Sequence, residues 1–290
     1  MGTDGTPSGG IGEDDRRSIS DTRQSYERIP YTSSPWTSSQ PVRLETIARL
    51  YGIEAVPADG CRVLEIGCGD GGNLIPLAVA HPSSHFVGVD LAPVHIETAR
   101  KLAAELELGN VELFADSFVG WGAGHAPFDY VIAHGLLSWV TPALQDRLLD
   151  ACANLLAPRG VAFVSYNTHP GWAMQHAIRE MMRHHTRGVA DIEEAVARAQ
   201  ALLDALIATV PGREAAYREH LQSIGAVARD PARRHYFAHE YLESENHPFY
   251  VRDFIERAAA HGLRYLADAD LVDCELDNIC LLYTSDADDE

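Results

Sequence analysis

Apolar residues are spaced differently in successive parts of the chain, and this spacing predicts its architecture. From residue 61 to residue 170, short continuous apolar runs alternate with segments whose apolar residues recur every three or four positions. Continuous runs are typical of strands buried on both faces, and the wider spacing is typical of helices. The alternation predicts an α/β fold with a Rossmann-like parallel sheet covered by helices. We expect strands in residues 61–67, 84–92, 111–117, 128–137 and 161–167, and helices in residues 71–82, 92–108 and 142–160.

Helical periodicity alone continues after residue 170. Helices are expected in residues 171–187, 191–210 and 212–228, a helix and loop in residues 233–250, and one more helix from residue 251. Gly262 is suited to end that last helix, because glycine readily adopts the left-handed conformation of a helix C-terminus, and a short strand should follow it. We therefore interpret residues 172–248 as a helical insertion and residues 249–268 as a return to the sheet.

The N-terminal residues lack this regularity. Residues 1–28 are rich in Gly, Ser, Asp and Arg, and such a composition buries too little apolar surface to fold, so a disordered leader is expected. The next segment, "YERIPYTSSPWTSSQP", carries aromatic residues. The apolar positions of "VRLETIARLYGI" then predict a helix ahead of the first strand.

Composition narrows the class of protein. Of the 290 residues 46% are hydrophobic, which is enough for a large core, and no apolar run reaches the roughly 18–20 residues of a membrane span. The N-terminus lacks the apolar stretch of a secretory signal. The five cysteines form no C-x-x-C pair, and the histidines match no zinc motif. We expect a cytoplasmic protein without membrane insertion and without a metal.

The charge balance bears on partners. Lys and Arg total 23 against 42 Asp and Glu, a net charge of −19. Such an excess repels phosphate backbones, so no nucleic-acid partner is expected, and a positively charged protein can approach more easily. The oligomeric state stays open.

The stretch "VLEIGCGDGGN", residues 63–73, places glycines directly after the first expected strand. Gly67, Gly69 and Gly72 have the G-x-G-x-x-G spacing of a dinucleotide site, where a helix N-terminus holds a pyrophosphate. Glu65 conflicts with that ligand, because a carboxylate beside the helix N-terminus repels phosphate. It suits S-adenosyl-L-methionine, which carries a cationic sulfonium and ammonium and no phosphate. The loop therefore favours S-adenosyl-L-methionine over NAD.

Two further acids follow the next two expected strands. Asp90 ends the second strand, where a carboxylate can accept ribose hydroxyls, although an NAD site has an acid there too. Asp116 follows the third strand, where it could accept from an adenine amino group; an ordinary turn-forming role is the alternative for both acids. The residues expected to bind the cofactor are Glu65, Gly67, Cys68, Gly69, Asn73, Asp90, Leu91, Asp116, Ser117 and His134, with Cys68 as a small spacer and not a nucleophile.

Residues 61–167 resemble the core of class I S-adenosylmethionine-dependent methyltransferases. The glycine stretch is similar to the first motif of that superfamily, "HFVGVDLA" to the second and "VELFADS" to the third. The stretches "YTSSPW", "HGLLSWV", "VSYNTHPGW", "MMRHHT" and "HEYLESENHPFYVRDF" are similar to bacterial methyltransferases that carry a methyltransferase regulatory domain. Some of those relatives methylate lysines of outer-membrane proteins, so the resemblance implies a protein as the methyl acceptor.

Four residues are candidates for contact with the acceptor: Tyr31, His134, Tyr166 and Asn167. Three of them end the fourth and fifth strands, at the edge where open α/β sheets bind ligands. Tyr31 and Trp36 precede the first core helix, and aromatic faces there can attract a sulfonium. A structural role is the alternative for each: a histidine bonded to backbone groups, a turn-forming asparagine, or an aromatic ring packed on the core.

These observations divide the chain into a disordered leader (1–28), an S-adenosylmethionine-binding methyltransferase core (29–170), a mainly helical regulatory region that returns to the sheet (171–273) and a tail (274–290). The tail includes "CLLYTSDADDE", which resembles sequencing-adapter read-through and which we expect to be non-native. The expected function is methyl transfer to an acceptor, with a protein lysine amine favoured. Two alternatives stay open: a cofactor-binding regulatory protein without turnover, and an NAD-dependent oxidoreductase.

Overall fold

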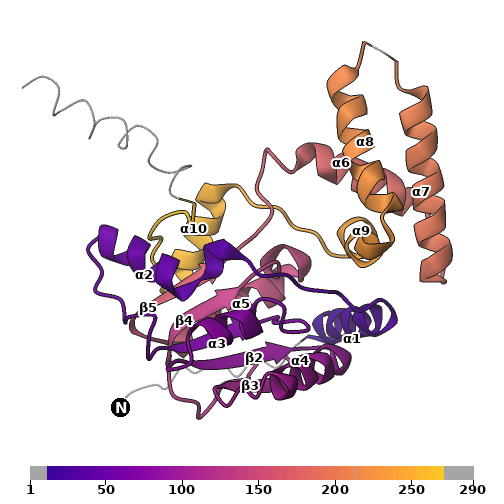
Figure 1. Cartoon of the computed structure of the whole chain (residues 1–290). Coiled ribbons are helices and arrows are strands. Elements are labelled where there is room, and N and C mark those ends of the chain that lie inside the picture. Colours follow the sequence, from indigo (N-terminus) through magenta and orange to yellow (C-terminus); the bar gives the residue numbers. More distant parts are fainter. Residues whose placement is uncertain (1–11, 212, 271–290) are drawn as a thin grey trace, which may run out of the picture.

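A parallel sheet of five strands forms the centre of the molecule (Figure 1). The structure is a computed structural model that describes residues 12–211 and 213–270. The strands are β1 (Arg62–Ile66), β2 (His85–Asp90), β3 (Val111–Ala115), β4 (Phe128–Ala133) and β5 (Leu156–Val164), in the order β3-β2-β1-β4-β5. The order reverses at β1, which is where open α/β sheets form a ligand-binding crevice at their carboxyl edge. The expected α/β fold is confirmed.

Helices cover both faces of the sheet. One face carries α2 (Pro41–Leu50), α3 (Leu74–Ala80) and α4 (Pro93–Glu105), and the other carries α5 (Pro142–Leu155) and α10 (Val251–Ala260). The neighbours Val63 and Leu64 on β1 are both fully buried and belong to the two different clusters. Successive side chains of a strand point to opposite faces, which is why the strands are continuous apolar runs in the sequence.

Four further helices pack around an apolar core of their own. They are α6 (Ala173–His185), α7 (Ile192–Thr209), α8 (Ala215–Arg229) and α9 (Arg234–Leu242), and Figure 1 shows them to one side of the sheet. Their buried side chains include Ile178, Val196, Leu203, Leu221 and Phe237. The prediction of consecutive helices after β5 is confirmed.

Arg179 on α6 connects these helices to the sheet. Its side chain is fully buried and donates to two backbone carbonyls. One belongs to Glu240 in the last turn of α9, and the other belongs to Glu245, which follows that helix. Its guanidinium also lies over the Trp139 ring, 5.5 Å from the centroid, in the short helix η2 (Leu137–Trp139) that follows β4. Burial lowers the pKa of Arg179 to about 10, so it stays charged at neutral pH.

The expectation of a disordered leader is wrong for residues 13–28, which form helix α1 (Glu13–Arg28). The helix has acidic residues in its first turn and Arg28 in its last, an arrangement that favours its dipole. It is held by contacts that apolar periodicity cannot reveal: Thr141 donates to Asp15, and Ser25 donates to Glu243. Residues 1–11 lie outside the described part of the chain.

Two secondary-structure elements also differ from expectation: the end of α5 and the segment after Gly262. Helix α5 ends at Leu155 and residues 156–160 belong to β5, because Pro158 disfavours helical conformation before it and Leu156 pairs with Phe128. The short strand expected after Gly262 is not formed in residues 263–270. Within the described residues β5 is an edge strand of the sheet and pairs with β4 alone. The tail 274–290 lies outside the described residues.

Membrane-spanning helices and metal clusters are both absent from the described residues. Within residues 12–211 and 213–270 no helix is both long enough and apolar enough to cross a membrane. The same residues contain no cluster of three or more His, Cys, Asp or Glu side chains arranged to hold a metal ion.

Candidate functional site

The turn after β1 is built from glycines in the left-handed region. Gly67, Gly69 and Gly71 have φ angles of 75°, 55° and 82°, where other side chains are strained. The N–H groups of Gly67 and Cys68 both donate to the carbonyl of Val89, at 2.8 and 3.2 Å, so the turn is fastened to the end of β2.

The Cys68 side chain faces the core. Its thiol is buried, and a side chain at Gly88 on β2 would stand 2.7 Å from its sulfur. Burial raises the pKa of the Cys68 thiol well above its ordinary value. A nucleophilic role is therefore not supported, and any contact of Cys68 with a cofactor would fall to its backbone.

Glu65 is a buried carboxylate at the carboxyl end of β1, with 3% of its surface exposed. One oxygen, Oε1, accepts a bond of 2.9 Å from Asn73, and the other, Oε2, has no hydrogen-bond partner in the part of the chain that is described. Burial raises the pKa of Glu65 to about 8, the Asn73 bond lowers it, and the charge of Asp90 raises it further. A buried carboxylate oxygen without a donor is costly, so this position calls for a cation or an N–H group.

Asp90 lies at the end of β2, opposite the glycine turn. Its Oδ2 accepts from the Gly69 N–H at 2.9 Å, and its Oδ1 accepts from the Ala92 N–H at 2.9 Å. The ring nitrogen Nδ1 of His95 lies 3.1 Å from the same Oδ1. The side chain is 13% exposed, so the carboxylate is held in one orientation but still reached from the crevice.

The third acid lies next to the second. The Asp116 N–H donates to the Asp90 carbonyl at 3.0 Å, since β2 and β3 are neighbours and end at the same edge. Asp116 is exposed and accepts from the Ser117 N–H at 2.7 Å, and Leu91 is half-buried beside them. The sheet therefore brings Glu65, Asp90 and Asp116 to one edge, as the sequence predicts.

Residues 29–39, which we call the strap, run across this edge. The Ser33 N–H and hydroxyl both donate to Asp70 in the glycine turn, and the Gly72 N–H donates to the Ser33 hydroxyl at 3.0 Å. The Trp36 N–H donates to Asn73 Oδ1 at 2.8 Å. The strap is thus bonded to the same loop that carries the cofactor candidates.

His134 lies beneath the strap. The Trp36 ring stacks on it with centroids 4.7 Å apart, and its Nδ1 lies 2.9 Å from the Ser165 hydroxyl. Burial lowers the pKa of His134, so the imidazole is neutral at neutral pH. Trp36 keeps 47% of its surface exposed, which places it at the mouth of the site.

Tyr166 and Asn167 do not join that group. The Tyr166 ring packs on Phe254 and Phe249, at 4.3 and 5.6 Å, beneath α10, because it points to the opposite face from Ser165. Burial raises the pKa of Tyr166 to about 12. The Asn167 Nδ2 is buried without a partner among the described residues, while its backbone bonds to Phe249.

Tyr31 contacts helix α9 of the helical region. Its ring lies 5.2 Å from that of His235 and 5.9 Å from that of His239. Burial raises the pKa of Tyr31, and the nearby charge of Glu240 raises it further. Glu240 is itself mostly buried, and burial raises its pKa to about 7 against a lowering by Arg179. The four acceptor candidates thus lie in three different surroundings.

Several residues of the site carried no signal in the sequence. Ser33, Asp70, His95 and Ser165 each make a hydrogen bond to the glycine turn, to Asp90 or to His134. Asp70 lies inside the glycine stretch of residues 63–73 but is not one of its spaced glycines, and the other three belong to no spaced motif, so the roles of all four depend on tertiary contacts. The position of His95 in the first turn of the helix after Asp90 is a signal that could have found it.

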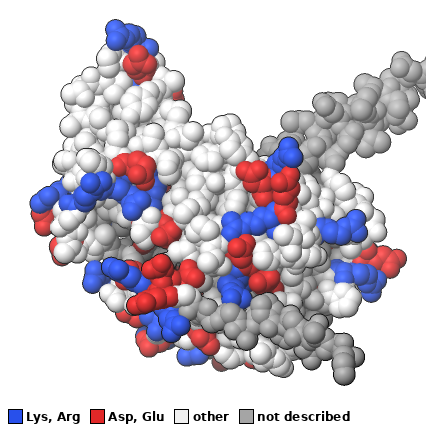
Figure 2. Space-filling view, turned by 180° about the vertical axis from the view of Figure 1, so that it is seen from behind, with Lys and Arg blue, Asp and Glu red and all other residues white. Residues whose placement is uncertain are grey.

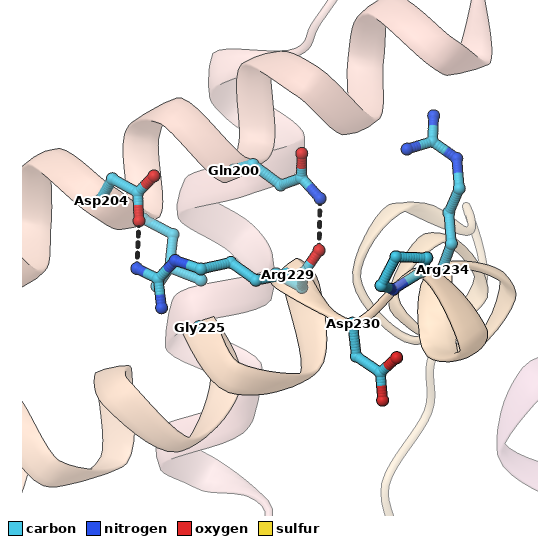
Figure 3. A pocket seen from close by; sticks show the side chains of 9 residues that line it. Gln200, Asp204, Gly225, Arg229, Asp230 and Arg234 are labelled. Atoms are coloured by element: carbon cyan, nitrogen blue, oxygen red, sulfur yellow. Dashed lines mark hydrogen bonds and ion pairs between the residues drawn. The ribbon is translucent and has the colours of Figure 1, made fainter.

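A cavity of about 330 Å³ lies elsewhere, between α7, α8 and the short helix η3 (Pro231–Arg233) (Figure 3). Its polar side chains are engaged with protein partners: Arg229 pairs with Asp204, Gln200 donates to the Ala228 carbonyl, and Arg234 pairs with Glu193. No lining residue comes from the sheet edge. This cavity is not the cofactor site.

The residues at the sheet edge fit S-adenosylmethionine. The unpartnered oxygen of Glu65 calls for a cationic or donor group, and the cofactor carries an ammonium and a sulfonium. A pyrophosphate would meet the carboxylates of Glu65, Asp70 and Asp90 around the glycine turn. The glycine spacing therefore does not denote a dinucleotide site.

Comparison with known proteins agrees with this fit. Residues 63–160 match the family model of a methyltransferase domain, and residues 233–285 match that of a predicted methyltransferase regulatory domain. PKMT2 from Rickettsia typhi, in a structure with AdoHcy, shares 35% identity with a TM-score of 0.74 over 84% of this chain. A ubiquinone biosynthesis O-methyltransferase of Xylella fastidiosa is 36% identical over 135 residues, 45% of this chain and 50% of that enzyme.

Two proteins of Rickettsia prowazekii are similar over most of the chain. RP789 is 38% identical over 88% of this chain, and RP028 is 35% identical over 83% of it. The chain covers 46% of RP789 and of the PKMT2 structure, but 96% of RP028. Given the five-stranded sheet, the acids at its edge and the two family matches, the chain belongs to the class I S-adenosylmethionine-dependent methyltransferases that carry a methyltransferase regulatory domain.

Proposed function

We propose that this chain transfers a methyl group from S-adenosylmethionine to an amine, and that the acceptor is a lysine side chain of a protein. The Glu65 carboxylate carries the cofactor part of the proposal, because its Oε2 is buried without a partner in the described structure. A cationic group, or a donor bound to it, would satisfy that oxygen. The carboxylates around the turn weigh against a nicotinamide dinucleotide.

The other cofactor contacts follow from the edge of the sheet. Asp90 would hold the ribose hydroxyls, since its Oδ2 accepts one N–H and keeps a lone pair for another donor. Asp116 and Ser117 would accept from the adenine amino group. The glycines at 67 and 69 allow the backbone to approach the ligand closely, and Asn73 orients Glu65.

When bound, the cofactor supplies a methyl carbon that is already activated by its positive sulfur. The residues of the chain need only align the amine at about 3–3.5 Å, exclude water and remove a proton. Neutral His134 and the Trp36 ring stacked on it would border the acceptor. We assign removal of the amine proton to Glu240, because its carboxylate lies near the Tyr31 phenol of the strap and a base with a pKa of about 7 is suited to neutral pH.

Charge and resemblance support a lysine acceptor. Glu240 lies near the phenols of Tyr31 and Tyr236, a surrounding of acid and aromatic groups that attracts an ammonium. The net charge of −19 favours a positively charged partner. The excess of acid is not concentrated on the face drawn in Figure 2, where acidic and basic side chains are intermixed. The name PKMT2 denotes a protein lysine methyltransferase for the Rickettsia typhi relative, in line with the resemblance of the motifs.

Calorimetric titration with S-adenosylhomocysteine, and with NADH in parallel, tests the cofactor. One-site binding of S-adenosylhomocysteine alone is expected, and binding of NADH alone would refute the proposal. Transfer of tritiated methyl groups to a bacterial envelope-protein extract, followed by hydrolysis and amino-acid analysis, tests the acceptor. Methyl-lysine is expected. Binding with no labelled acceptor would favour the alternative of a cofactor-binding regulatory protein.

A further inference from the structure

We propose that His239 and Glu243 form a latch that holds the strap against α9 while they share one extra proton, and that His239 is thereby a positioning residue for cofactor binding. The inference rests on the proposed function, because its readout is affinity for the cofactor. It concerns the second family domain, since both residues lie in the part that matches the methyltransferase regulatory domain.

His239 lies between two oxygens that can only accept. Its Nε2 is 2.7 Å from the Ile29 carbonyl oxygen, and its Nδ1 is 2.7 Å from Oε1 of Glu243. Only 5% of the residue is exposed, so water cannot easily replace either partner. A neutral imidazole has one N–H group, and a carboxylate has none. Both bonds therefore require one more proton, carried as an imidazolium or on the carboxyl group of Glu243.

The latch acts on the strap at its first residue, Ile29. Two residues on, the Tyr31 N–H donates to Nε2 of His95 at 3.0 Å, which leaves Nδ1 of His95 to donate to Asp90. The Tyr26 ring fills the space between the two histidines, stacked on His239 at 4.4 Å and edge-on to His95 at 5.4 Å. The latch is therefore continuous with the carboxylate assigned to the ribose.

Other titratable groups surround the latch. Those facing it from α9, from α6, from α1 and the strap, and from the Asp90 side are His235, Glu240, Arg179, Tyr26, Tyr31, His95 and Asp90. Burial raises the pKa of Tyr26, and the charges of Glu243 and Asp90 raise it further, so the phenol stays neutral. The pKa of His235 is lowered by burial and by His239.

Loss of the extra proton breaks one of the two bonds. The remaining N–H of His239 stays with the Glu243 carboxylate, because a charged acceptor holds it more strongly than the Ile29 carbonyl. The strap is then released from α9, and the strap residues bonded to the glycine turn lose support. Cofactor affinity should fall as the pH rises through this step. Glu65 acts in the opposite direction, because its ionisation, with a pKa of about 8, improves binding of the ammonium group of the ligand. The affinity ratio of variant to wild type separates the two effects.

Calorimetric titration of S-adenosylhomocysteine into the full chain, from about pH 6 to about pH 9, provides the test. His239→Phe keeps a ring on Tyr26 but removes both N–H donors. At about pH 6 we expect this variant to bind S-adenosylhomocysteine roughly three- to tenfold more weakly than wild type does. At about pH 9 the two should bind equally, because wild type has lost the latch too.

Glu243→Gln gives the opposite signature. The introduced amide can donate to Nδ1 of a neutral His239, whose Nε2–H still donates to Ile29, so no extra proton is needed. This variant should bind more tightly than wild type at the high end of the pH range. It also keeps the test decisive if circular dichroism shows that His239→Phe does not fold.

His261 provides a matched control. Its ring nitrogens also face two carboxylate oxygens, Asp150 Oδ1 at 2.6 Å and Asp146 Oδ1 at 3.1 Å, on α5 and away from the strap. His261→Phe should bind like wild type at every pH. Wild type that binds no S-adenosylhomocysteine would refute the proposed function. If wild type binds, three results would each overturn the latch. They are an affinity ratio of His239→Phe to wild type that does not change with pH, no gain in affinity for Glu243→Gln at high pH, and a loss for His261→Phe equal to that for His239→Phe.

Discussion

The carbonyl oxygen of Ser33 occupies the space that a side chain at Gly72 would need. The backbone of Gly72 is not in the left-handed region, so the strap alone demands a glycine there. The third glycine of the G-x-G-x-x-G spacing is therefore explained by packing of the strap and not by a phosphate.

Gly72→Ala should displace the strap. Because the added methyl group would overlap backbone atoms of Ser33, the free energy of unfolding should fall by about 1–3 kcal/mol, and S-adenosylhomocysteine should bind more weakly. Urea denaturation and calorimetry measure the two effects. Gly109→Ala is the control, since a Cβ there meets nothing within 4 Å. Equal behaviour of the two variants would contradict this role of the strap.

Glu65→Gln should raise the free energy of unfolding at high pH and, separately, lower the affinity for S-adenosylhomocysteine. The pKa of Glu65 is raised from 4.5 to about 8 in the folded protein, so between these values the native state holds a proton that the unfolded state has released, and stability falls as the pH rises. The variant lacks this fall and should be more stable than wild type near pH 9 by roughly 1–3 kcal/mol, with a smaller difference near pH 5.

The same variant should lose affinity for S-adenosylhomocysteine at neutral pH, because it cannot ionise to meet the ammonium group of the ligand. Thermal unfolding at several pH values and calorimetry at one measure the two quantities. An unchanged affinity would show that Glu65 does not face the ligand.

Asp90→Ala should abolish or strongly weaken cofactor binding, by at least about tenfold, since it removes a charged acceptor from the site. Asp129→Ala is a matched control at the opposite edge of the sheet, where Asp129 accepts from the Arg62 N–H at 2.8 Å. The control should alter thermal stability more than it alters affinity. Similar losses of affinity in both variants would place the effect in the fold and not in the site.

Glu240→Gln should change the pH dependence of methyl transfer. The rate should rise with pH through about 7 in wild type as Glu240 ionises, and this limb should be lost in the variant. Affinity for S-adenosylhomocysteine should stay within about twofold of wild type, because Glu240 is assigned to the acceptor and not to the cofactor. A retained limb would assign proton removal to another group.

The sequence predicted the sheet because its central strands are buried on both faces. Val63 and Leu64 must then both be apolar, and this leaves a pattern that can be read without a structure. The meeting of the acids at positions 65, 90 and 116 could also be predicted from the sequence, because the carboxyl ends of parallel strands lie at one edge of the sheet. The helix at residues 13–28 was missed because it has few apolar residues and is held by contacts of Asp15, Ser25 and Tyr26 to distant elements.

The acceptor side of the site was decided by the tertiary structure. Tyr166 follows Ser165 by one residue, yet the alternation of the strand turns it beneath α10 while Ser165 meets His134. The role proposed for His239 depends on its contact with the carbonyl of Ile29, which is 210 positions away in the sequence. The sequence by itself therefore determined the strands and the acids at their ends, because these follow from local periodicity. Only the tertiary structure decided which side chains face one another, because that depends on the direction of each side chain and on contacts between distant segments.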